Sequence, residues 1–217
     1  MIEQLLPAGV VTVEAFEDMP GEPAFPGEED LVADAVEGRR CEFITARRCA
    51  RAALTKLGYA PAAIRPGPRR EPQWPPGVVG SITHTAGFRA AAVAPRSILT
   101  SIGIDAEQSV PLPDDVQELV TVGDEREMLA SLASALPVIH WGLLLLSAKE
   151  ALYKAWYPLT GRWLDFKDAR LTIDPAGTFV AKLLINGDRT DGEPPLTELS
   201  GRFLVAHGLV ATAVIVS

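Results

Sequence analysis

Two carboxylates end an apolar stretch near the middle of the chain. The segment from Ser101 to Glu107 reads Ser-Ile-Gly-Ile-Asp-Ala-Glu, so Asp105 and Glu107 stand two positions apart. Residues i and i+2 of a strand point to the same side of it. Paired carboxylates suit a hard divalent cation, because Mg²⁺ takes one or two of them beside waters and substrate phosphates. A strand that ends in Asp as a simple cap would give the same pattern.

A further acid lies in a segment with helical spacing. The run from Ser147 to Ala155 reads Ser-Ala-Lys-Glu-Ala-Leu-Tyr-Lys-Ala, and it contains Glu150 and Lys154 four residues apart. Residues with this separation project from one face of a helix. A solvated helical ion pair, worth about 0.3–0.5 kcal/mol, explains the spacing equally well.

Residues that suit phosphate gather in the first half of the chain. The segment Gly80–His84 ends in Thr83 and His84, and a hydroxyl and an imidazole at a strand end can bind phosphate. Arginine offers a planar fork that matches phosphate with two hydrogen bonds. The arginines here are Arg39, Arg40, Arg47, Arg48 and Arg51 on an expected helix, and Arg69 and Arg70 in a Pro-rich loop. An exposed loop histidine and a solvated helix face are the alternatives.

The order and spacing of these segments resemble a known family. Gly103-Ile-Asp-Ala-Glu107, followed about forty residues later by Lys149-Glu-Ala-Leu-Tyr-Lys-Ala155, is similar to the paired signature of the 4′-phosphopantetheinyl transferases. The Arg-rich run Arg39–Arg51 and the stretch Gly80–Phe88 resemble those of the surfactin-type branch, with its enterobactin-synthetase-component-D-like and actinobacterial members. The resemblance extends from about Glu37 to Phe166.

This resemblance implies an activity and a set of ligands. Members transfer the 4′-phosphopantetheine group of coenzyme A, the co-substrate, to a serine of an apo acyl or peptidyl carrier protein. These carriers serve fatty acid, polyketide and nonribosomal peptide synthesis, and adenosine 3′,5′-bisphosphate is released. The expected cofactor is Mg²⁺, and coenzyme A is expected in a cleft between two similar halves.

The resemblance also assigns roles to residues. It places Asp105, Glu107 and Glu150 around Mg²⁺. It places Arg39, Arg47, Arg69, Thr83 and His84 around the adenosine phosphates of coenzyme A. It places Lys149 and Lys154 near the pyrophosphate, beside Asp105. The expected catalytic residues are Glu150, Lys154 and Glu107, with Glu150 preferred to Glu107 as general base.

Some positions leave alternatives open or depart from the family pattern. On a wheel of 100° per residue, Arg40 shares a stripe with Arg47 and Arg51, whereas the resemblance selects Arg39. Leu146 stands where an aromatic residue is common in the family, and Phe88 stands for a frequent Tyr. After the catalytic segment come side chains that could be core or could contact the carrier: Tyr153, Trp156, Leu159, Arg162, Trp163 and Phe166.

Composition limits the other readings. The 217-residue chain carries a net charge of −8, which argues against broad nucleic-acid binding and hence against a nuclease. Another Mg²⁺-dependent phosphoryl-transfer enzyme, or a catalytically silent carrier-binding module, is the alternative.

The apolar runs are too short to span a membrane, and the first ten residues lack a signal-peptide pattern. Cys41 and Cys49 lie too far apart on one helix for a disulfide. We therefore expect a cytoplasmic monomer.

The order of predicted helices and strands indicates an α+β protein with antiparallel sheets, built from two halves, 1–102 and 103–217. The resemblance implies a pseudo-twofold arrangement of these halves. Helices are expected over 31–57, over 111–134 with a break at Gly123, and over 140–157, closed by Pro158. Strands are expected over 78–83, 88–94, 98–105, 169–173, 178–185, 202–206 and 209–216. The Pro-rich segment 60–77 is expected to be irregular.

Overall fold

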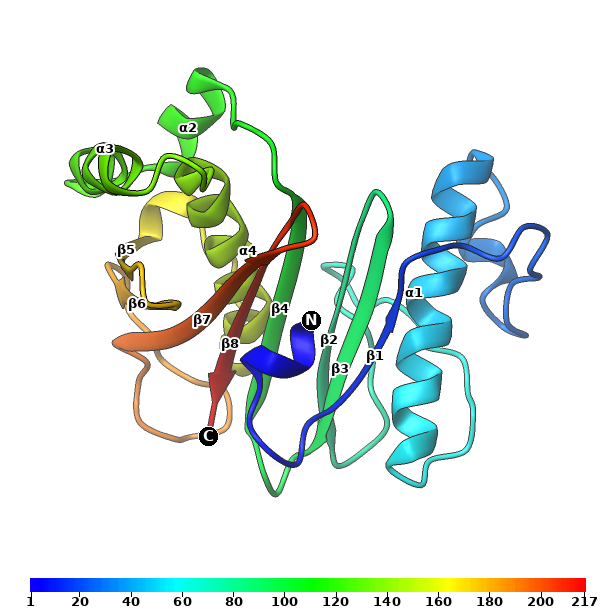
Figure 1. Cartoon of the computed structure of the whole chain (residues 1–217). Helices are drawn as coiled ribbons and strands as arrows, with labels where there is room; N and C mark the ends of the chain where they lie inside the picture. The colour runs from blue at the N-terminus through cyan, green and yellow to red at the C-terminus, as the bar shows by residue number, and fades with distance from the viewer.

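The computed structural model describes all 217 residues and shows two antiparallel sheets, each covered by one long helix (Figure 1). The first sheet has the order β1 (Val11–Ala15), β3 (Phe88–Pro95), β2 (Val78–Thr85). Helix α1 (Glu37–Lys56) packs on β3 and β1. The predicted α+β class with antiparallel sheets is confirmed.

The second sheet is larger and carries helix α4 (Trp141–Thr160) on β4 and β8. Its order is β4 (Ser101–Gln108), β8 (Leu209–Val216), β7 (Glu198–Ala206), β6 (Thr178–Leu183), β5 (Ala169–Asp174). The short helices α2 (Asp114–Val120) and α3 (Glu125–Ala135) lie at one corner, at the upper left of Figure 1. Three 3₁₀ turns, η1 (Ile2–Leu5), η2 (Glu29–Leu31) and η3 (Phe166–Asp168), complete the chain.

Several predicted boundaries need correction. Helix α1 begins at Glu37, not at residue 31, because η2 occupies the preceding segment and Val36 has extended backbone angles. Pro158 does not end α4, since a proline in the last turn removes only one helical hydrogen bond. The helix ends at Gly161 in the left-handed region, with φ +65°.

The strand limits also shift by a few residues. Strand β4 begins at 101, β6 ends at 183, and β7 begins at 198. The break predicted near Gly123 separates α2 from α3, and Gly123 has φ +60°. Since β4 begins at Ser101, the proposed boundary after residue 102 lies inside this strand.

Side-chain hydroxyls of β2 join the two sheets. Strands β2 and β4 lie side by side without a backbone ladder (Figure 1). The Ser81 hydroxyl accepts a hydrogen bond from the Ile104 amide at 3.1 Å, and the Thr83 hydroxyl accepts one from the Ala106 amide at 2.9 Å. Two hydroxyls thus satisfy backbone donors that a neighbouring strand would otherwise satisfy.

Helix α4 approaches β4 most closely at Gly103. A Cβ atom at this position would overlap the carbonyl oxygen of Ala151 and would lie 2.7 Å from the Ala155 nitrogen. Both are backbone atoms of α4, so no side chain could move to make room. Glycine at position 103 therefore sets the spacing between the strand that carries Asp105 and the helix that carries Glu150.

We predict that Gly103→Ala lowers the free energy of unfolding by about 3 kcal/mol, because backbone must move to admit the methyl group. The control is Gly38→Ala in α1, where a Cβ would have no neighbour within 4 Å. This change should stabilise the protein by up to about 1 kcal/mol. Urea unfolding measures both values. Equal stability of Gly103→Ala and wild type would contradict the close helix–strand contact.

Candidate active site

A cleft of about 750 Å³ lies between the two halves. Helix α1 and the segment 66–74 form one side, β2 forms the floor with Asp105 of β4, and α4 forms the other side. The predicted site residues that line it are Arg39, Arg47, Arg69, Thr83, His84, Asp105, Glu150 and Lys154. The structure thus brings together all the predicted residues except Glu107 and Lys149.

Asp105 is the most constrained carboxylate of the cleft. Its side chain is buried, and Oδ1 accepts hydrogen bonds from Lys154 Nζ at 2.7 Å and from the Thr83 hydroxyl at 3.3 Å. Its Oδ2 accepts a hydrogen bond from the Ser147 hydroxyl at 2.8 Å. Two residues of α4 in the second half and one of β2 in the first therefore fix its orientation.

The two glutamates of the predicted metal site differ in their surroundings. Glu150 faces the cleft from α4 and makes no hydrogen bond or ion pair within the chain. Burial raises the pKa of Glu150; Lys154 opposes this, and Asp105 adds to it. Burial also raises the pKa of Glu107, and the negative charge of Asp105 raises it further. The carboxylates therefore repel one another, which favours a positive charge between them.

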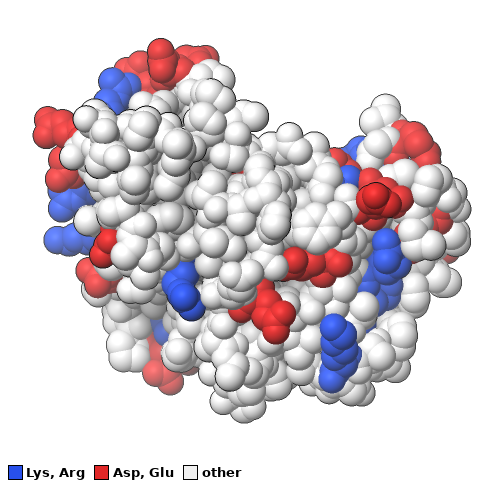
Figure 2. Space-filling model, in the orientation of Figure 1, with Lys and Arg blue, Asp and Glu red and all other residues white.

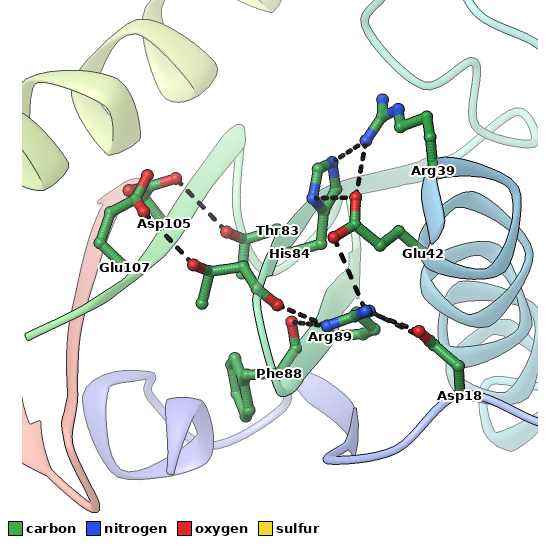
Figure 3. Close-up of polar contacts among 10 residues, drawn as sticks. Asp18, Arg39, Glu42, Thr83, His84, Phe88, Arg89, Asp105 and Glu107 are labelled. Atoms are coloured by element: carbon green, nitrogen blue, oxygen red, sulfur yellow. Dashed lines mark hydrogen bonds and ion pairs between the residues drawn. The ribbon is translucent and has the colours of Figure 1, made fainter. Parts of the chain in front are cut away.

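The structure corrects the expectation that three carboxylates meet at one point. No group of three His, Cys, Asp or Glu side chains is arranged as ligands of one metal ion. Glu107 does not line the cleft, and its Oε2 accepts from the Thr85 hydroxyl at 3.4 Å (Figure 3). Asp105 and Glu150 do face the cleft. Their chemistry suits Mg²⁺, which needs only one or two carboxylates when substrate phosphates supply the other oxygens.

The opposite end of the cleft is basic. The guanidinium of Arg47 lies 3.6 Å from the centre of the Phe43 ring, and its Nε donates to the Ile64 carbonyl at 3.0 Å. The pKa of Arg47 is lowered to about 10, mainly by burial; Glu28 opposes this shift, and the neighbouring Arg51 and Arg39 add to it. A bound anion would relieve this mutual repulsion.

His84 belongs to a chain of charged side chains (Figure 3). Arg39 donates to its Nε2 at 2.8 Å, so the proton of the neutral ring lies on Nδ1, which faces Glu42 at 3.7 Å. Glu42 also lies 3.7 Å from Arg89, which pairs with Asp18 at 2.7 Å. Burial lowers the pKa of His84, and the charge of Arg39 lowers it further. Of the two competing arginines, Arg39 lines the cleft and Arg40 does not.

The lining of this cleft is net positive although the protein is net negative, because its Arg and Lys residues outnumber its three carboxylates: Arg39, Arg47, Arg69, Arg70 and Lys154 against Glu71, Asp105 and Glu150. On the face shown in Figure 2, acidic groups gather over the corner formed by α2 and α3, where Asp114, Asp115, Glu118 and Glu127 are exposed. The cleft instead collects arginines, His84 and Lys154. The structure therefore has a local basic site within an acidic protein.

Comparison with known proteins gives the family. Residues 27–94 match the 4′-phosphopantetheinyl transferase N-terminal domain, and residues 101–205 match the 4′-phosphopantetheinyl transferase superfamily. The chain is 52% identical to 4′-phosphopantetheinyl transferase Svp of Streptomyces mobaraensis, over all of this chain and 89% of the relative. It is 49% identical to 4′-phosphopantetheinyl transferase Npt of Nocardia iowensis, over 99% of both chains.

The chain belongs to the 4′-phosphopantetheinyl transferase family. It is 45% identical to 4′-phosphopantetheinyl transferase PptT of Mycobacterium tuberculosis, over 99% of this chain and 97% of the relative. A more distant relative, enterobactin synthase component D of Escherichia coli K12, is 36% identical over 54% of each chain. No helix of this transferase has both the length and the apolar character needed to cross a membrane. Cys41 and Cys49 are free thiols, as predicted.

Lys149 does not reach the cleft of the transferase, so its predicted place beside the pyrophosphate needs correction. Its buried ammonium donates to Glu125 at 2.9 Å and to the carbonyls of Val120 and Phe166 at 2.8 and 2.7 Å. Burial lowers the pKa of Lys149, and Glu125 opposes this shift. All three donors of the ammonium are therefore used to join α2, α3 and η3 to α4.

The Thr83 hydroxyl likewise makes its hydrogen bonds within the protein. Its hydroxyl is buried, accepts from the Ala106 amide and donates to Asp105. It lines the cleft, but it acts on the carboxylate and the strand junction instead of offering a free donor for phosphate. Residues that sequence reasoning missed are Ser147, Glu42 and Glu125. Ser147 lies inside the helical motif and Glu42 inside the Arg-rich run, whereas Glu125 carried no signal.

The side chains after the catalytic segment divide into core and surface. Trp156 and Leu159 are buried in the core of the second half. Trp163 is 57% exposed, and its ring lies 4.7 Å from that of Tyr153. Tyr153 has the one buried side-chain polar atom without a hydrogen-bond partner, its hydroxyl oxygen. Tyr153 lines both the cleft and an adjoining cavity of about 100 Å³, which Trp163 and Phe166 also line.

We predict that Lys149→Met destabilises the transferase by about 3–5 kcal/mol, because Glu125 would remain buried without its counter-charge. The double variant Lys149→Met/Glu125→Gln should recover part of this loss. In the folded variants, coenzyme A affinity should change far less than the roughly tenfold expected for a lost phosphate contact. A stable Lys149→Met protein with strongly weakened coenzyme A binding would restore the phosphate role.

Proposed function

We propose that this protein transfers the 4′-phosphopantetheine group of coenzyme A to a serine hydroxyl of acyl or peptidyl carrier proteins, releasing adenosine 3′,5′-bisphosphate. One observation carries the proposal: a single cleft is lined by Arg39, Arg47 and Arg69 from α1 and the segment 66–74, and by Asp105, Glu150 and Lys154 from β4 and α4. A ligand that carries both phosphates and a reactive pyrophosphate matches these two groups of charges. Relatives that bear the transferase name and align over nearly the whole chain support it.

The protein's task in phosphoryl transfer is mainly to position reactants and to offset developing negative charge. We assign the adenosine phosphates to Arg39, Arg47 and Arg69, together with His84. Lys154, held at the Asp105 carboxylate and still partly exposed to the cleft, supplies fixed positive charge beside the pyrophosphate. These groups would orient the β-phosphate of coenzyme A toward the incoming serine.

Asp105 and Glu150 would hold Mg²⁺, with Glu107 as a further acid nearby. When bound, this ion supplies charge neutralisation at the pyrophosphate oxygens. Lys154 occupies one oxygen of Asp105 at 2.7 Å, so its ammonium must share that carboxylate with the ion. Burial raises the pKa values of Glu107 and Glu150, and the charge of Asp105 adds to both shifts, so a cation at this place would be favoured.

Glu150 is the better candidate for the general base that accepts the serine proton. Holding the cation would weaken it as a base, so its two proposed roles compete. Its carboxylate lines the cleft and has no partner within the chain. Burial raises the pKa of Glu150 toward neutral pH, and a base is most efficient when its pKa lies near the working pH. Glu107 is the second candidate, because it lies outside the cleft lining and is bonded to Thr85.

The surroundings of Tyr153 suit the apolar part of such a substrate. Its unpartnered hydroxyl and the small cavity toward Trp163 lie next to Glu150. The exposed Trp163 is our candidate for contact with the carrier protein. We further propose a monomeric enzyme that acts in the cytoplasm, where two free thiols would stay reduced.

We predict that Asp105→Asn and Glu150→Gln each lower the transfer rate about 100-fold or more, because each removes a charged ligand that would hold Mg²⁺ beside the pyrophosphate. The assay incubates the protein with coenzyme A, Mg²⁺ and an apo carrier protein and follows the mass of the carrier. Glu118→Gln, whose carboxylate is exposed on α2, is the matched control and should keep full activity. Near-normal turnover of either cleft variant would sink the assignment.

We also predict that His84→Ala and Arg39→Ala weaken coenzyme A binding about tenfold or more, since each loses a phosphate contact. Dephospho-coenzyme A, which lacks the 3′-phosphate, should be affected much less by His84→Ala. Arg40 is adjacent to Arg39 in the sequence but does not line the cleft. Arg40→Ala is therefore the control and should bind coenzyme A normally. Calorimetric titration measures these affinities. Equal losses for both ligands would remove His84 from the 3′-phosphate.

A further inference from the structure

Three buried hydroxyls from three different elements lead to Asp105. Thr83 lies on β2, Ser147 on α4 and Thr212 on β8, and their side chains are 2%, 0% and 0% exposed. Thr212 stands directly opposite Asp105 in the β4–β8 pair. Buried polar groups are costly unless each finds a partner. Their convergence on one carboxylate therefore calls for a role beyond packing.

The protons of this chain can be followed one by one. A carboxylate only accepts, and a hydroxyl has a single proton. The Ser147 hydroxyl lies 2.8 Å from Asp105 Oδ2 and must donate its proton to that oxygen. The donor in the 2.9 Å contact between the Ser147 and Thr212 hydroxyls is then Thr212, and its single proton is shared between the Ser147 hydroxyl and the Ser147 carbonyl, which also lies at 2.9 Å. Thr212 thus holds Ser147, and Ser147 holds Asp105.

Ser147 behaves differently from other hydroxyls on the helices. Thr55 and Thr160 donate to the carbonyls of Arg51 and Trp156, four residues earlier in their own helices. This is the usual local solution for a helical hydroxyl. Ser147 instead reaches across to β4, and Thr212 supports it from β8. A serine without a role in the site could bond to its own helix in the same way and would need neither of these two contacts.

The position of Ser147 on α4 connects it to the rest of the site. Glu150 follows three residues later and Lys154 seven residues later, so all three share one face of the helix. The Ser147–Asp105 bond therefore fixes how the helix that carries Glu150 and Lys154 sits against the strand that carries Asp105. It also holds Oδ2 while Lys154 binds Oδ1.

We propose that Ser147 and Thr212 are positioning residues that orient Asp105 and align it with Glu150 for binding a divalent cation at the pyrophosphate end of the cleft. As an aid to phosphoryl transfer, this role rests on the proposed function. Neither hydroxyl touches the substrate. They act through the Asp105 carboxylate, as partners behind metal-binding carboxylates generally do.

The test separates the hydroxyl of Thr212 from its methyl group. Thr212→Val keeps the shape and removes the proton donor, whereas Thr212→Ser keeps the donor and loses the methyl. Mg²⁺ is titrated calorimetrically into the full-length chain mixed with coenzyme A and no carrier protein, and thermal unfolding is recorded alongside. We expect Thr212→Val and Ser147→Ala to weaken Mg²⁺ binding about tenfold. Thr212→Ser should stay within about twofold of wild type, even if it lowers Tm as much as Thr212→Val.

Two results would overturn the positioning role: unchanged Mg²⁺ affinity in both hydroxyl-free variants, or an equal loss in Thr212→Ser and Thr212→Val that follows their stability. Carrier-protein mass after incubation of the wild type checks the proposed function separately. A wild type that modifies the carrier while its variants bind Mg²⁺ normally refutes only the positioning role. If the variants show the expected changes in Mg²⁺ affinity but the wild type modifies no carrier, only the transfer reaction is refuted.

Discussion

The packing of α4 along one side of β4 is the contact on which the site depends. Alternate residues of β4 meet successive turns of the helix. The Ser101 hydroxyl donates to the Ala155 carbonyl at 2.7 Å, Gly103 lies against the backbone of Ala151, and Asp105 accepts from Ser147. Each step of two residues along the strand thus matches a step of about four along the helix, which runs in the opposite direction. A carboxylate at position 105 is thereby brought beside a helix face that carries an acid and a lysine.

The same contact explains which sequence expectations failed. Alternation along β4 correctly places Asp105 toward α4. Glu107 is the next residue on the same face of the strand, but it lies two residues further along β4 and therefore further from Glu150. It finds Thr85 of β2 instead. Lys149 fails because Glu125 and the carbonyls of Val120 and Phe166 accept its three donors. These partners lie in α2, α3 and η3, so they required the tertiary structure.

Local patterns predicted the class and most of the elements, and eight of the ten predicted site residues line the cleft, because these features depend on apolar spacing and on short motifs. What escaped prediction depends on distant segments. Glu42 shows this: its neighbour Arg39 carried the motif signal, yet Glu42 joins His84 of β2 to Arg89 of β3. The choice between Arg39 and Arg40 likewise depended on how α1 is rotated against the first sheet. A helical wheel gives relative directions only and cannot fix that rotation.

Two buried ion pairs show how irregular segments are held at the cleft from both sides. In the first half, both carboxylate oxygens of Glu28 accept from Arg51 at 2.8 and 3.0 Å, and one also accepts from the Ile64 amide at 2.7 Å. The segment that leads to Arg69 is thus tied to α1. In the second half, Glu125 and Lys149 fasten η3 and the α2–α3 corner to α4. Burying such pairs adds little net stability, because desolvation offsets most of the attraction. Their contribution is geometric: each pair fixes loops whose own sequences, rich in proline, glycine and charge, could not specify a position beside the cleft.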